Sequence, residues 1–127
     1  MYNILIVDDS KTIRAVINKT IEIAGVPVAN IWEAANGQEA LEILREQWVD
    51  IVFADINMPV MTGIELVDKM SEEGIINSVP VVIVSTEGSR QRIDDLRARG
   101  VRAYLRKPFT PEALKDVIAE ILETNHA

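Results

Sequence analysis

The feature that most constrains the fold of this chain is a regular alternation of short apolar runs with longer amphipathic segments. Residues 4–7, 51–54 and 81–84 are continuous apolar runs rich in β-branched side chains, as expected for strands covered on both faces. Residues 102–106 form a less regular run of this kind, and residues 28–33 a weaker one. The alternation predicts an α/β fold with a parallel sheet and right-handed crossovers.

The segments between these runs carry helical periodicity and helix-end signals. Apolar residues recur at helical spacing within residues 13–24 and again within residues 114–122. Asn36 and Thr62 each precede a glutamate at capping-box spacing, and Thr110 precedes a proline suited to the first helical position. The pattern predicts five strand–helix units, which form a doubly wound five-stranded sheet with helices on both faces.

Size and composition favour one ordinary globular domain. The chain has 127 residues, of which 48% are hydrophobic and 26% are charged, so we expect a single domain over residues 1–127 with a short polar tail from about residue 124. The sequence has no cysteine, which excludes disulfides and thiolate chemistry. No segment resembles a signal peptide or a membrane span, so we expect a cytoplasmic protein. A net charge of -7 argues against binding to nucleic acid or anionic membranes.

Polar side chains follow several of the predicted strands at the point where each strand ends. Asp8 and Asp9 follow the first apolar run, Asp55 follows the third strand, Ser85 the fourth and Lys107 the last. Ligands bind at this edge of open α/β sheets, so three carboxylates, a hydroxyl and an ammonium group should converge there. Carboxylate oxygens without histidine or cysteine favour Mg²⁺. An oxygen nucleophile, a metal and a fixed cation are the groups that phosphoryl transfer requires.

Each of these residues taken alone has an ordinary structural interpretation. An Asp-Asp pair after a strand usually caps a helix or lies in a solvated turn, and Asp55 alone fits a turn. The joint occurrence at successive strand ends is what favours a functional site.

Four segments carry a resemblance to a known family over nearly the whole chain. They are ILIVDDS at residues 4–10, DINMP at 55–59, VSTE at 84–87 and YLRKPF at 104–109. In these segments the chain resembles the receiver domain of two-component response regulators, and in form it is similar to single-domain chemotaxis-type regulators. The resemblance implies a flavodoxin-like (βα)5 fold with strand order 2-1-3-4-5.

The resemblance also implies roles at the acidic end of the sheet. It makes Asp55 the phosphoacceptor, Asp9 a direct magnesium ligand and Asp8 an acidic partner that acts through metal-bound water. Asn57 would give the metal its backbone carbonyl, so that its side chain is free to influence hydrolysis. Lys107 would contact the phosphoryl group, with the following proline bond in the cis form.

Three further positions would pass the signal on. Ser85 would move toward the phosphoryl group, Tyr104 would follow it as an aromatic switch, and Glu87 would tune the lifetime of the phosphorylated state. Serine at position 85 replaces the commoner threonine, which keeps the hydroxyl and loses a methyl contact.

The resemblance implies a signalling protein that catalyses only its own phosphorylation and dephosphorylation. A histidine kinase or phosphotransfer protein would be the phosphodonor. An effector, in chemotaxis or motility signalling, would dock on the face formed by the fourth helix, fifth strand and fifth helix of a monomer. The open alternative within the family is a phosphorelay intermediate or phosphate sink.

A cluster of arginines marks a candidate output surface. Six of the eight arginines lie between residues 90 and 107. Helical spacing places Arg90 and Arg97 on one face, and strand spacing does the same for Arg102, Tyr104 and Arg106. The alternative is a solvated helix whose arginines pair with neighbouring aspartates. The functional hypothesis is a basic surface that binds an acidic partner.

Two other protein classes share the general architecture. Haloacid-dehalogenase-type phosphatases also use a strand-end aspartate with magnesium, but they resemble one another in a second aspartate two residues later, where this chain has Asn57. Flavodoxin-like flavin proteins need hydroxyls and backbone donors where this chain has Asp8 and Asp9. Among the remaining residues, Trp32 and Trp48 are interpreted as packing residues.

Overall fold

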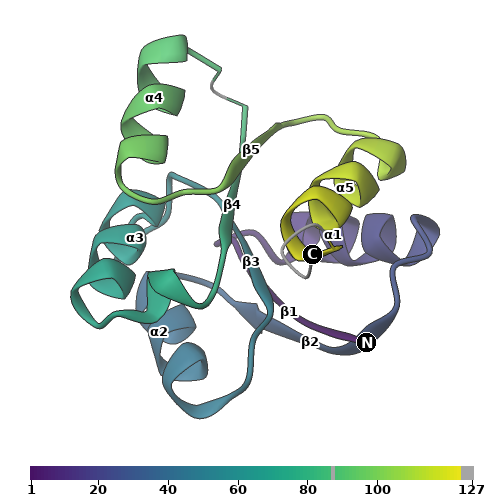
Figure 1. Ribbon diagram of the computed structural model, residues 1–127, viewed down its shortest axis with the longest axis horizontal. Helices are drawn as coiled ribbons and strands as arrows, with labels where there is room; N and C mark the ends of the chain where they lie inside the picture. Colours follow the sequence, from purple (N-terminus) through teal and green to yellow (C-terminus); the bar gives the residue numbers. More distant parts are fainter. Residues whose placement is uncertain (87, 124–127) are drawn as a thin grey trace.

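A computed structural model of the chain describes residues 1–86 and 88–123. Its centre is a five-stranded parallel sheet with the strand order β2-β1-β3-β4-β5, which confirms the predicted fold (Figure 1). The weakly predicted second strand is present and pairs with the first. The strands are β1 (Tyr2–Val7), β2 (Val28–Ala34), β3 (Ile51–Ala54), β4 (Val81–Ser85) and β5 (Ala103–Arg106).

The helices begin where the local sequence signals predicted. Asn36, Thr62 and Thr110 each accept a hydrogen bond from the backbone N–H three residues later, and Thr62 completes a capping box with Glu65. The main helices are α1 (Lys11–Ile23), α2 (Gly37–Glu46), α3 (Gly63–Glu72), α4 (Arg90–Ala98) and α5 (Pro111–Ile118). A 3₁₀ turn (Ile75–Asn77) and a π-helical segment (Ala119–Glu123) were not predicted.

The sheet lies between two helical layers, with α1 and α5 on one face and α2, α3 and α4 on the other (Figure 1). Alternate residues of β1 enter different cores: Ile4 and Ile6 pack in the α1–α5 layer, while Leu5 and Val7 pack in the opposite layer. Both faces are therefore buried, which explains why the strands are apolar without alternation.

The helices differ in how much of each the core buries. Helix α3 buries the side chains of Leu66, Val67 and Met70. Helix α4 buries only Leu96, so it is the helix that the core holds least firmly.

Trp48 corrects the interpretation of both tryptophans as packing residues. Trp32 is partly buried against the core, but Trp48 is 78% exposed and its Nε1–H donates to Asp50 Oδ1 at 3.0 Å. Trp48 follows the end of α2 in the connection to β3, beyond the helical face that packs on the sheet. No helix in the described part of the chain is long and apolar enough to cross a membrane. The predicted polar tail lies outside the described residues.

Candidate phosphoacceptor site

The three predicted carboxylates meet at the carboxyl edge of the sheet. Asp8 and Asp9 lie directly after β1, and Asp55 lies directly after β3. Because β1 and β3 are paired in register up to Val7 and Ala54, the residues that follow them are brought together. One carboxylate oxygen from each of the three aspartates lies within 4.8 Å of the others.

Lys107 brings a positive charge to this cluster from the end of β5. Its Nζ lies 3.2 Å from Asp8 Oδ2 and 3.8 Å from Asp55 Oδ2. Its backbone N–H donates to the carbonyl of Ser85 at 2.9 Å, so β4 fixes the point from which the side chain extends. The Lys107–Pro108 peptide bond is cis, as the resemblance implied.

Asp8 is buried, and hydrogen bonds fix both its backbone and its side chain. Only 2% of the residue is exposed. Its Oδ1 accepts from the Ser10 N–H at 2.9 Å, and its own N–H donates to the Ala34 carbonyl at 3.1 Å. Asp9, by contrast, is exposed. The two neighbouring carboxylates therefore occupy different environments: one is fixed by the protein and one faces solvent.

Asp55 is fixed through both its backbone and its side chain. Its N–H donates to the Val7 carbonyl at 3.0 Å, and its Oδ1 accepts from the Ile56 N–H at 2.7 Å. Burial raises the pKa of the Asp55 carboxyl above its ordinary value of 3.8; the Lys107 ammonium opposes this shift, and the Asp8 carboxylate adds to it. An additional cation at the cluster would favour the ionised form of Asp55, because it would offset both burial and the neighbouring negative charge.

The donor set fits a small hard cation. Three carboxylates supply oxygen ligands without histidine or cysteine, and one of them, Asp9, is open to solvent, which leaves room for the waters that Mg²⁺ retains. Asn57, whose backbone carbonyl was predicted as a further ligand, is exposed in the connection that follows Asp55.

The predicted switch residues lie beside this cluster on β4 and β5. Ser85 is buried at the end of β4, opposite Arg106 in the β4–β5 register. Tyr104 is partly buried, and its hydroxyl is buried without a hydrogen-bond partner among the described residues. A buried hydroxyl without a hydrogen bond lowers the stability of the folded state by about 1–3 kcal/mol. The Tyr104 side chain therefore loses less free energy when it leaves this position. Glu87 lies outside the described residues.

The predicted arginine surface is divided in the structure. Arg90 and Arg97 line one depression together with Asp94, which agrees with their predicted common face. Arg106 is exposed beside the β4–α4 connection, where its guanidinium approaches Gly88. Arg102 precedes β5 and lines a separate hollow, shared with Tyr2 and Asp50.

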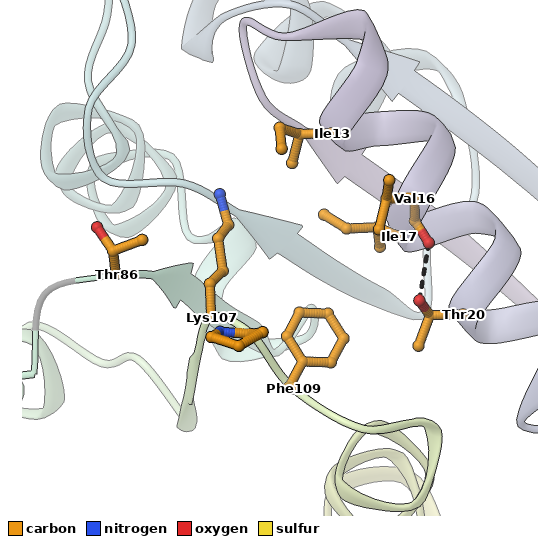
Figure 2. Close-up of a pocket in the computed structure, with 8 residues that line it drawn as sticks. Ile13, Val16, Ile17, Thr20, Thr86, Lys107 and Phe109 are labelled. Atoms are coloured by element: carbon orange, nitrogen blue, oxygen red, sulfur yellow. Dashed lines mark hydrogen bonds between the residues drawn. The ribbon is translucent and has the colours of Figure 1, made fainter.

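An apolar groove opens beside Lys107, and sequence reasoning missed it (Figure 2). Side chains of α1 face Phe109 and Lys107 across this groove, and Val16 is 54% exposed. The available signal was the apolar stripe of α1, because this stripe includes Val16, which does not pack into the core. The groove has a volume of about 390 Å³ and is lined by Ile13, Val16, Ile17, Thr20, Thr86, Lys107, Pro108 and Phe109.

Comparison with known proteins agrees with this geometry. The family model described as the response regulator receiver domain matches residues 4–119. The chain belongs to the response-regulator receiver family. CheY-like receiver-domain proteins are typically non-enzymatic signalling proteins. The match gives the haloacid-dehalogenase alternative no support.

Single-domain chemotaxis receivers are among the similar proteins. A CheY homolog of Campylobacter jejuni is 37% identical over 122 residues, which cover 95% of this chain and 92% of the relative. The solved structure of CheY4 from Vibrio cholerae has a TM-score of 0.83 at 35% identity and covers 96% of this chain and 99% of its own.

A second similar structure is a complex that includes Mg²⁺ and another protein. The CheX–CheY–BeF3–Mg²⁺ complex from Borrelia burgdorferi matches with a TM-score of 0.83 at 26% identity, covering 94% of this chain and 88% of that one. Receiver domains bind Mg²⁺ at an acidic pocket, and this chain has a cluster of three aspartates at the carboxyl edge of its sheet.

Proposed function

We propose that this receiver is a phosphorylation-controlled switch in chemotaxis or motility signalling, with Asp55 as the phosphoacceptor. The observation that carries the proposal is the position of the Lys107 ammonium, 3.8 Å from Asp55 Oδ2, in a cluster of three carboxylates. A phosphohistidine of a histidine kinase or phosphotransfer protein is the donor. The cytoplasmic location and monomeric state expected from the sequence belong to this proposal.

The geometry supports direct transfer to the aspartate. A carboxylate oxygen of Asp55 forms a bond to phosphorus while the phosphorus–nitrogen bond of the donor breaks and the imidazole leaves. Lys107 balances negative charge on the phosphoryl oxygens. Asp8, Asp9, Asp55 and the backbone carbonyl of Asn57 would hold Mg²⁺, which when bound supplies further positive charge to the phosphoryl group. Water later hydrolyses the acyl phosphate and restores the Asp55 carboxylate.

Phosphorylation would then act on α4 and β5. Ser85 turns toward the new phosphoryl oxygens, and Tyr104 moves into the space that becomes available. Two features support this movement: Tyr104 keeps a buried hydroxyl without a described partner, and α4 buries only one side chain. Asn57 and Glu87 are proposed to tune how long the phosphorylated state lasts.

The apolar groove supports a docking place for the phosphodonor. It is continuous with the acceptor site through Lys107, whose ammonium contacts Asp55 while its stem lines the groove. A donor protein must hold its phosphohistidine over Asp55, so an apolar helical surface that carries the histidine fits this location. Acetyl phosphate is too small to need the groove.

A transfer experiment tests both parts of this proposal. The phosphohistidine-bearing domain of a chemotaxis-type kinase from the source organism should phosphorylate the chain in Mg²⁺, and Asp55→Asn should abolish this. Val16→Glu should slow transfer from that domain about tenfold or more but leave acetyl phosphate labelling unchanged, because only the protein donor uses the groove. Ile23→Glu is the matched control, since Ile23 is on the same helix, is exposed and does not line the groove. Equal slowing with both donors would contradict a docking role for the groove.

The effector is proposed to dock on the α4–β5–α5 face through Arg90, Arg97, Tyr104 and Arg106, with Arg102 at its margin. Joint charge reversal of Arg90 and Arg97 should weaken capture of an effector by the phosphorylated chain without altering phosphorylation of Asp55. Effector capture by the Arg102→Glu variant shows whether the docking surface extends as far as Arg102. Effector capture that does not depend on phosphorylation would instead favour a relay or phosphate-sink protein.

A further inference from the structure

Arg14 connects the acidic site to two neighbouring elements. It lies in the first turns of α1, and only 14% of its side chain is exposed. Its Nη1 donates to the backbone carbonyl of Asp8 at 2.6 Å, and its Nε donates to Glu33 Oε1 at 2.9 Å. One guanidinium therefore joins the end of β1 to β2 from a position on α1.

The carbonyl that Arg14 contacts belongs to the peptide unit that joins Asp8 to Asp9. A hydrogen bond to this oxygen fixes the plane of that peptide, and the Asp9 side chain starts from its other end. The preceding peptide unit is already held, because the Asp8 N–H donates to the Ala34 carbonyl. The Arg14 contact thus holds the peptide unit from which Asp9, the solvent-exposed aspartate of the site, extends.

We propose that Arg14 is a positioning residue of the acidic site: it sets the direction of the Asp9 carboxylate and thereby strengthens binding of Mg²⁺. This inference rests on the proposed function, because it concerns the same cation site. Glu33 orients the guanidinium by accepting from its Nε. The planar guanidinium suits this task, since its donors point in fixed directions toward two acceptors at once.

The charge of Arg14 and its proposed positioning role predict opposite changes in Mg²⁺ affinity when Arg14 is replaced. Arg14→Gln deletes a positive charge that contacts the Asp8 backbone at the acidic site, and the loss of its repulsion alone would then make Mg²⁺ bind more tightly. Loss of positioning would make Mg²⁺ bind more weakly. The sign of the change therefore separates the two effects.

Calorimetric titration of MgCl2 into the unphosphorylated protein provides the measurement. Arg14→Gln should raise the Mg²⁺ dissociation constant about tenfold, the lower end of the range for groups that orient metal ligands. Arg14→Lys should fall between the wild type and Arg14→Gln, because an ammonium keeps the charge but cannot span Asp8 and Glu33. Lys19→Gln makes the same charge change at an exposed position of α1 and should leave Mg²⁺ affinity unchanged.

Thermal unfolding without Mg²⁺ shows whether each variant is folded. An Arg14→Gln protein that is folded and binds Mg²⁺ as tightly as the wild type, or more tightly, would overturn the positioning role. If Arg14→Gln does not fold, wild-type affinity in Arg14→Lys would overturn it. Failure of the wild-type chain itself to bind Mg²⁺ would instead count against the proposed function.

Discussion

The acidic site and helix α4 lie in the same small domain but are held with very different firmness. Backbone hydrogen bonds from Asp8 to Ala34 and from Asp55 to Val7 extend the sheet pairing beyond the strand ends and fix both aspartates. Helix α4 is attached through one buried side chain, Leu96, and its remaining residues are at least partly exposed. The proposed chemistry therefore lies on the firmly held part of the domain, and the proposed response lies on the part that is easiest to move.

The attachment of α4 is also unequal along its length. Leu96 and Arg99 lie at its carboxyl end, where Arg99 Nη1 contacts Asp68 Oδ2 of α3 at 2.6 Å. The amino end is the one connected to Ser85 through the β4–α4 connection. Under the proposed function, a change at the acidic site would therefore displace the amino end of α4 while the carboxyl end remains in place.

The largest expected contrast comes from adding one methyl group in each region. In Gly63→Ala the new Cβ would overlap the Asp55 carbonyl and lie 2.9 Å from Ile56 Cα, both backbone groups of the rigid site. In Gly88→Ala it would meet only the flexible Arg106 side chain, at 3.1 Å. We expect Gly63→Ala to lower the free energy of unfolding by about 3 kcal/mol and Gly88→Ala by less than about 0.5 kcal/mol, in urea titrations. Similar losses of unfolding free energy in the two variants would contradict the claim that the acidic site is held more firmly than the region next to α4.

Removing the charge of Asp55 should stabilise the domain in the absence of divalent cations. Because its pKa is raised on folding, the folded state binds this proton more tightly and loses stability as the pH rises above 3.8 through the folded pKa. Asp55→Asn should therefore raise the free energy of unfolding at pH 7 by roughly 1 kcal/mol, a usual size for one site. The difference in unfolding free energy between Asp55→Asn and the wild type should shrink as the pH falls toward 4. An advantage independent of pH, in urea titrations with chelator, would contradict this explanation.

The smallest expected effect concerns the carboxyl end of α4. Arg99→Gln removes exposed ion pairs with Asp68 and Asp95, so the free energy of unfolding should fall by only about 0.5 kcal/mol. Hydrogen exchange of α4 amides should nevertheless become faster, while amides near Asp8 and Asp55 stay unchanged. Lys69→Gln is the matched control, since it removes a surface ion pair within α3. Faster exchange at the acidic site would show that the two regions are not independent.

The sequence predicted features that depend on short-range signals or on the sheet edge. Helix starts at Asn36 and Thr62 follow from local capping chemistry. The convergence of Asp8, Asp9 and Asp55 follows because parallel strands end at one edge. The strand order came from the family resemblance, since spacing alone does not specify which strands are neighbours.

Features that depend on tertiary packing were not predicted. Arg14 contacts Asp8 and Glu33 only once α1 is laid against β1 and β2, so its sole sequence signal is a cation in the helix that follows the Asp-Asp pair. The exposure of Trp48 depends on where α2 ends relative to the sheet. Arg102 was assigned to the same strand face as Tyr104, but β5 begins after it, so the strand periodicity does not apply there.

The most direct test of the account is the intact mass of the protein after incubation with acetyl phosphate and MgCl2. We expect one added phosphoryl group on the wild type, and none with chelator or in Asp55→Asn. An unmodified wild type under all conditions, or an equal mass increase in Asp55→Asn, would contradict the assignment of Asp55 as the phosphoacceptor.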